Sequence, residues 1–285
     1  GTVDKLYYTT YRLTGYDLKA TLENHQLDAS FLAKNSAMEV QARLDGKLKP
    51  HDVAAHLTIQ APKLDWQSMK LMDVPLSTSH RFDVSFVSDL QQKYVLDASM
   101  TGTSVKSPKK TFQTKDLYMG FATSADSTHA YMRAGDLDVA FQGRGYVDSL
   151  LAKLDAFTSR ADAQWTSKTI VQEELKSLLP DVCLKAEAGN DNPIANFLSM
   201  QGVSFNRLAM DIDTSPQEGI NGETLICGMH TDSLLIDSIR LDLKHGDDGL
   251  DFLTEVISNT RKNQEAFEIN LDGHIGNGQA QLLLQ

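Results

Sequence analysis

The chain has few side chains arranged for metal binding. Its eight histidines are scattered, at His25, His51, His56, His80, His129, His230, His245 and His274. None stands two or four residues from another, so any metal site would have to be assembled from distant segments. The two cysteines, Cys183 and Cys227, lack metal-ligand spacing. They could pair in an oxidising compartment or remain free thiols.

Catalytic motifs are also missing. Gly143-Arg-Gly145 resembles part of a dinucleotide fingerprint but lacks its third glycine, so a hairpin end explains it better. No Walker-type phosphate loop, serine elbow or His-Glu-x-x-His helix is present. Carboxylates such as Asp211 and Asp213 occupy every second position, which is typical of a solvated strand face. We therefore predict no catalytic residues, no metal site, no cofactor and no enzymatic activity.

Composition excludes further classes. A net charge of −11 and a pI near 5.1 argue against nucleic-acid binding, which depends on lysine and arginine neutralising phosphates. No apolar run reaches the ~20 residues of a membrane-spanning helix. The chain opens at Gly1 rather than methionine, so we expect it to belong to a longer protein.

The dominant pattern is a two-residue alternation of apolar and polar side chains, as in Phe82-Asp-Val84-Ser-Phe86. Such segments form strands with one apolar and one polar face. We predict strands at 5–13, 16–24, 27–34, 37–48, 52–61, 64–72, 75–88, 91–101, 112–123, 128–134 and 136–142, then at 203–213, 222–230, 233–245, 250–258, 265–274 and 278–284. Segment 250–258 could also be drawn as a helix.

Between these blocks the apolar spacing becomes helical. Residues 148–179 form one long amphipathic helix, or two with a break near Thr166 and Ser167, with Asp148 as N-cap and Pro180 as the stop. A short helix is predicted at 193–201, capped by Asn192. The domain prediction is a β-meander at 2–145, a helical insert at 146–202, and strands at 203–285 that complete the same sheet.

The predicted fold class is mainly β, a large antiparallel curled sheet with one long helical insert and one short helix. Its apolar residues either fill the core of a β-sandwich or line an open trough for acyl chains. The insert could be a lid on such a trough or simply the cap of an ordinary core. The candidate lining residues are Leu57, Ile59, Phe82, Val84, Phe86, Met119, Phe121, Leu137, Val139, Phe141, Leu208, Met210 and Ile212.

Several stretches resemble TamB-type proteins of the AsmA-like β-groove group, in particular those of Bacteroidetes, in their internal or C-terminal region. They are Ser-Asp-Leu-Gln-Gln-Lys-Tyr-Val-Leu-Asp-Ala at 88–98, Gly-Asp-Leu-Asp-Val at 135–139, Glu-Leu-Lys-Ser-Leu-Leu-Pro-Asp at 174–181, Gly-Asn-Asp-Asn-Pro-Ile-Ala-Asn-Phe-Leu at 189–198, residues 232–239, and Phe-Glu-Ile-Asn-Leu-Asp-Gly at 267–273. The resemblance extends over most of the chain as a pattern of strand edges and turns.

This resemblance implies a periplasmic part of an inner-membrane-anchored protein, with the anchor outside this chain. The family is linked to phospholipid transport between the two membranes and to outer-membrane protein assembly. Expected partners are lipid acyl chains and, for the full-length protein, an outer-membrane barrel protein. The alternatives are a β-sandwich that binds another protein without lipid, and, less favoured, a sugar hydrolase, for which Trp66 and Trp165 offer little stacking surface.

Overall fold

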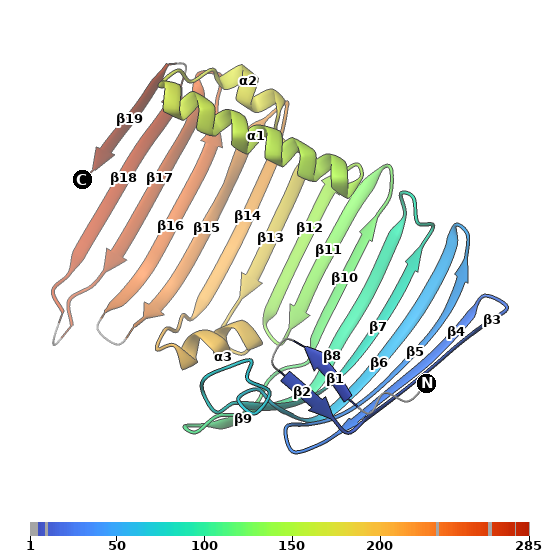
Figure 1. Cartoon of the computed structure of the whole chain (residues 1–285). Coiled ribbons are helices and arrows are strands. Elements are labelled where there is room, and N and C mark those ends of the chain that lie inside the picture. Colours follow the sequence, from blue (N-terminus) through green and yellow to red (C-terminus); the bar gives the residue numbers. More distant parts are fainter. Residues whose placement is uncertain (1–4, 9–10, 232–233, 262–263, 277, 285) are drawn as a thin grey trace. The chain divides into compact units, whose positions relative to one another are not determined.

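The structure, a computed structural model, describes residues 5–8, 11–231, 234–261, 264–276 and 278–284 (Figure 1). The chain divides into two compact units, Gly1–Ala122 and Thr123–Gln285. The predicted fold class is confirmed: the protein is mainly β and antiparallel, with one long helix and two short ones among the described residues. Residues 9–10 of predicted strand 5–13 and residue 233 of predicted strand 233–245 lie outside the described residues.

The first unit is built from antiparallel neighbours in chain order. A separate hairpin pairs β1 (Lys5–Tyr8) with β2 (Tyr11–Thr14). The main sheet has the order β3-β4-β5-β6-β7-β8-β9, and β10 pairs with β8. The bounds are β3 (Tyr16–Glu23), β4 (Gln26–Lys34), β5 (Met38–Lys49), β6 (Asp52–Asp65), β7 (Ser77–Ser88), β8 (Tyr94–Lys106), β9 (Thr111–Gln113) and β10 (Leu117–Thr123).

Three strand predictions in this unit are wrong. Segment 5–13 is not one strand, because β1 and β2 are separate strands that pair antiparallel with each other. Strand β6 extends from the predicted segment 52–61 to Asp65, and most of the predicted strand 64–72 is a turn. The turn forms because the Asp65 carboxylate accepts the backbone N–H of Ser68 at 2.9 Å. This local hydrogen bond satisfies the Ser68 N–H without a neighbouring strand. Predicted strand 112–123 is divided into β9 and β10, and between them Asp116 accepts the backbone N–H of Gly102 at 2.9 Å.

The second unit has the strand order β11-β12-β13-β14-β15-β16-β17-β18-β19, again antiparallel throughout. The strand bounds are β11 (Ser127–Ala134), β12 (Leu137–Arg144), β13 (Val182–Ala188), β14 (Arg207–Ser215), β15 (Gly219–His230), β16 (Leu235–His245), β17 (Gly249–Ser258), β18 (Phe267–Gly276) and β19 (Gln279–Leu284). The helices are α1 (Val147–Ser167), α2 (Gln172–Ser177) and α3 (Pro193–Met200). Segment 250–258 is therefore a strand rather than a helix.

The predicted helical insert 146–202 needs a correction, because β13 lies inside it. This strand pairs with β12 and with β14, so it is an interior member of the sheet. Val182, Leu184 and Ala186 alternate with polar residues, but the strand is short and follows Pro180 directly. The unit boundary after Ala122 also differs from the predicted boundary at 145.

The helix ends follow from local hydrogen bonds. The predicted break in 148–179 is present: Lys168 adopts a left-handed conformation at φ 57°, and α2 starts after Val171. Asp148 is not the N-cap; Thr123 Oγ1 accepts the Val147 N–H at 3.1 Å instead. Asn192 caps α3 as predicted, since its Oδ1 accepts the Ala195 N–H at 2.8 Å.

Candidate functional site

In the first unit the strand register gathers the predicted lining residues on one face. Leu57 lies opposite Val84 and Ile59 opposite Phe82, and directly opposed residues share a face. Phe86 joins them, since it follows Val84 by two positions. We call this surface the first apolar face; it comprises Leu18, Leu22, Leu27, Phe31, Val40, Leu44, Leu57, Ile59, Phe82, Val84, Phe86, Leu96 and Met100.

The opposite face of the same strands is polar and locally paired. Arg81 Nε lies 2.7 Å from Asp83 Oδ2, and Thr58 Oγ1 donates to Asp83 Oδ1 at 3.1 Å. The hydrogen bond from Arg81 is the main reason that the pKa of Asp83 is lowered. The alternation seen in the sequence is thus realised as two chemically distinct faces.

The second unit repeats this arrangement. Val139 lies opposite Ala186, which lies opposite Met210; Phe141, Leu184 and Ile212 form the next row. The second apolar face comprises Met132, Leu137, Val139, Phe141, Val182, Leu184, Leu208, Met210, Ile212, Ile220, Ile226, Ile239, Leu241, Leu243, Leu250, Phe252, Val256, Ile269, Leu271, Ile275, Leu282 and Leu284.

Met119 and Phe121 stand two residues apart on β10 and share one side of that strand. Both are half-buried. They are the predicted lining residues that the registers above do not join to either apolar face.

Both apolar faces are incompletely covered. Among the predicted lining residues only Leu137 is buried, at 5% exposure, and the others are half-buried. Leu22 on the first face is 61% exposed, and Leu282 and Leu284 on the second are 67% and 70% exposed. A sandwich core would bury such side chains almost completely. The described residues therefore do not form the sealed interior of the sandwich alternative.

Helices α1 and α2 cover one end of the second apolar face (Figure 1). Leu150 of α1 is buried against Gly143 of β12, where an added Cβ would clash with the Leu150 side chain. Beyond α1, Gln172 donates to the Ile275 carbonyl of β18, and Ile170 accepts the Gly278 N–H at 2.9 Å. The helical segment thus spans strand ends from β12 to β18 and covers the rim, while the rest of the face stays open.

Three hollows of this unit lie on its polar face. Hollows of about 590, 780 and 620 Å³ are lined mainly by polar-face side chains such as Lys185, Asp211 and Arg240. On the apolar face the cavity beneath α1 and α2 has a volume of about 170 Å³. The predicted open trough for acyl chains, lined by the apolar side chains, stays a prediction.

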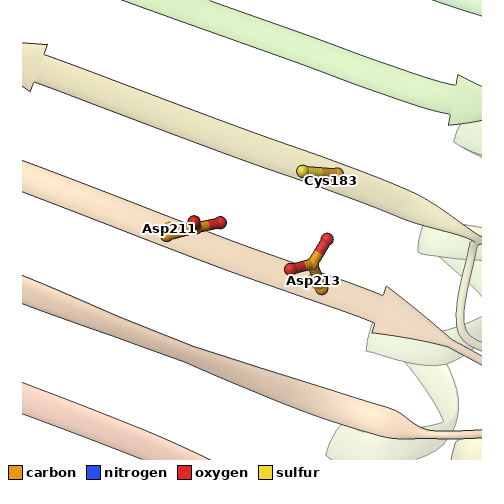
Figure 2. A group of neighbouring side chains, drawn as sticks. All are labelled: Cys183, Asp211 and Asp213. Carbon is orange, nitrogen blue, oxygen red and sulfur yellow. The ribbon is translucent and has the colours of Figure 1, made fainter.

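One polar cluster combines potential metal ligands. Figure 2 shows Cys183 on β13 beside Asp211 and Asp213 on β14, with ligand atoms within 4.8 Å of one another. Lys185 Nζ already pairs with Asp211 Oδ2 at 2.8 Å. Burial and the neighbouring Asp213 raise the pKa of the Cys183 thiol, which keeps it protonated and weakens it as a ligand. The sequence did not single out this cluster because its members are distant along the chain.

Cys183 and Cys227 are both free thiols. Of the two alternatives left open by the sequence, a disulfide and two free thiols, the structure has the second. No described helix combines the length and apolar character needed to cross a membrane. Comparison of the chain with protein-family models, curated proteins and solved structures finds no significant match.

Proposed function

We propose that this chain is a non-enzymatic periplasmic module of an envelope-spanning protein, and that its apolar faces shield lipid acyl chains during phospholipid transport. The observation that carries the proposal is the in-register, half-exposed apolar face present in each unit. Exposed apolar surface costs about 25 cal/mol per Å² in water. Large uncovered patches on folded proteins usually mark a ligand or partner.

An acyl chain suits these faces chemically. The rows of leucine, isoleucine, valine, methionine and phenylalanine offer no directional hydrogen bond, and a hydrocarbon chain requires none. Affinity would come from area removed from water and would be spread over many residues. Lipid head groups would remain in water at the edges of the faces. We accordingly expect single substitutions such as Val84→Ala to weaken binding only slightly.

The test is site-specific photo-crosslinking in cells, with the crosslinking residue at Val84 or at Met210. Val87 supplies a matched control: it lies on the same strand as Val84, faces the opposite side and is 44% exposed. Ala209 is the corresponding control for Met210. We expect phospholipid adducts at Val84 and Met210 and few at Val87 and Ala209.

The absence of lipid adducts at both Val84 and Met210 would overturn the proposal. Equal adduct yields on both faces would do the same, because they would indicate non-specific labelling. Polypeptide adducts without lipid would favour the other role of the proposed family, support of outer-membrane protein assembly, or the protein-binding alternative. An outer-membrane barrel protein is the partner expected for the full-length protein.

A further inference from the structure

A small apolar cavity lies between the helical segment and the second apolar face. Its volume is about 170 Å³. Phe157 and Trp165 of α1 and Leu175 of α2 line it on one side. Ile220, Leu250 and Ile275 of the sheet line it on the other. We call this cavity the α1–α2 pocket. Here α1 and α2 form a second layer over the apolar face.

Two polar side chains that line the pocket, Gln164 and Gln172, are hydrogen-bonded to other protein groups. Gln164 is 4% exposed; its Nε2 donates to Glu174 at 2.9 Å and its Oε1 accepts the Val171 N–H at 2.8 Å. Gln172 is 6% exposed and donates to the Ile275 carbonyl. These bonds hold both amide groups against the protein.

His245 also lines the pocket, and its Nδ1 is buried without a hydrogen-bond partner among the described residues. Its Nδ1 is packed against Gly219, where an added Cβ would lie 2.6 Å from that nitrogen. Burial lowers the pKa of His245, which favours the neutral ring at pH 7. The lining also includes Lys176, and the rest of the pocket surface is mainly hydrocarbon.

The volume of the pocket and its position on the sheet indicate which ligand it can hold. Apolar cavities of roughly 150 Å³ in other proteins stay dry and bind molecules such as benzene. The α1–α2 pocket has room for a short hydrocarbon segment and is too small for a whole lipid. Its floor continues the rows of the second apolar face, because Leu250 lies opposite Ile275 and two positions before Phe252. A chain lying on that face would end in the pocket.

We propose that the α1–α2 pocket receives the methyl end of one acyl chain. This inference rests on the proposed function, because it assigns the end point of a chain that the second apolar face holds. It also gives the helical segment a role beyond covering the rim: α1 and α2 fix where the chain stops.

The two tryptophans make the proposal testable in the full chain. Trp66 lies in the first unit and Trp165 lines the pocket, so Trp66→Phe leaves Trp165 as the single tryptophan, which can be excited selectively over tyrosine. Bromine quenches tryptophan only at short range. The probes are palmitic acid brominated at its terminal carbon and palmitic acid brominated next to its carboxyl group. We expect the terminal bromine to quench Trp165 several-fold more strongly.

A pocket-filling variant provides the control, because Trp165 is 65% exposed and could meet a probe from outside. Ala161→Phe fills the pocket from α1, while Ala163→Phe makes the same change at an exposed position outside its lining. We expect Ala161→Phe to abolish the terminal-bromine quenching and Ala163→Phe to leave it unchanged. If Ala161→Phe fails to fold by circular dichroism, Ile220→Phe fills the same space from the sheet.

The possible failures separate the two proposals. Equal or stronger quenching by the carboxyl-side bromine, or quenching that persists in the filled variant, would overturn the pocket assignment. Absent quenching together with lipid adducts at Met210 would overturn the pocket assignment alone. Absent quenching together with absent adducts at Met210 and Val84 would overturn the proposed function as well.

Discussion

Replacing Leu150 with alanine should detach the N-terminal end of α1 from the second apolar face. Leu150 is 5% exposed and lies over Gly143, with Val182 and Phe141 around the same point. Burial of a leucine side chain contributes about 1.5–3 kcal/mol, and the cavity left by truncation adds to the loss. A single helix covers this site and can settle inward, so we expect a loss of about 2–3 kcal/mol.

Leu151→Ala is the matched control, because Leu151 is the next residue of α1 and is 57% exposed. Its truncation should change stability by less than about 0.5 kcal/mol. Urea unfolding followed by circular dichroism measures the global effect, and native-state hydrogen exchange of the α1 amides measures local detachment. Similar effects of the two substitutions in both measurements would refute the packing of Leu150 described above.

Asn192→Ala should lower the free energy of unfolding by about 2–3 kcal/mol in urea titrations, because Asn192 is fully buried, caps α3 and donates to Asp136 Oδ1 at 2.7 Å. The control Asn190→Ala changes an exposed position nearby and should leave the free energy of unfolding unchanged. Equal effects of the two substitutions would contradict this prediction. Burial lowers the pKa of His80 in the folded state. As the pH falls below about 6.5, His80 therefore binds a proton in the unfolded state before it does so in the folded state. The free energy of unfolding should accordingly fall between pH 7.5 and 5.5. His80→Leu should reduce this fall in urea titrations at both pH values, and an unchanged pH dependence would contradict it.

The two-faced strands could be predicted because their signal is local. Side chains alternate across a strand whatever its neighbours are, so Phe82, Val84 and Phe86 had to share a side. The cap of α3 was equally local, since Asn192 and Pro193 act within one helical turn. These features need no knowledge of tertiary contacts.

The errors occurred where a local hydrogen bond or a sheet partner decided the outcome. The Asp65 carboxylate turns the chain at a segment whose composition suits a strand. The opposite happened at β13: its short alternation became a strand because β12 and β14 lie on either side to pair with it. The sequence pattern alone does not show whether a local hydrogen bond or pairing with a neighbouring strand will decide the structure of such a segment.

The apolar side of each strand was predictable from the sequence, but whether that side is covered was not. Alternation is identical in an uncovered face and in a sandwich core, because both require one apolar side per strand. Only the exposure of residues such as Leu282 distinguishes them. The α1–α2 pocket was beyond prediction for a related reason, since Trp165, Ile220 and Ile275 meet only through the fold.

The partial exposure of both faces also connects stability with binding. A strand ladder satisfies backbone hydrogen bonds, but half-exposed apolar rows contribute less than a sealed core would. A hydrocarbon ligand that covers these rows binds the folded chain and not the unfolded one, so it must stabilise the fold by mass action. Because the covering is spread over many side chains, this stabilisation should survive the loss of any one of them. It should weaken in steps as charged residues are introduced along a row such as Leu57, Val84 and Ala98.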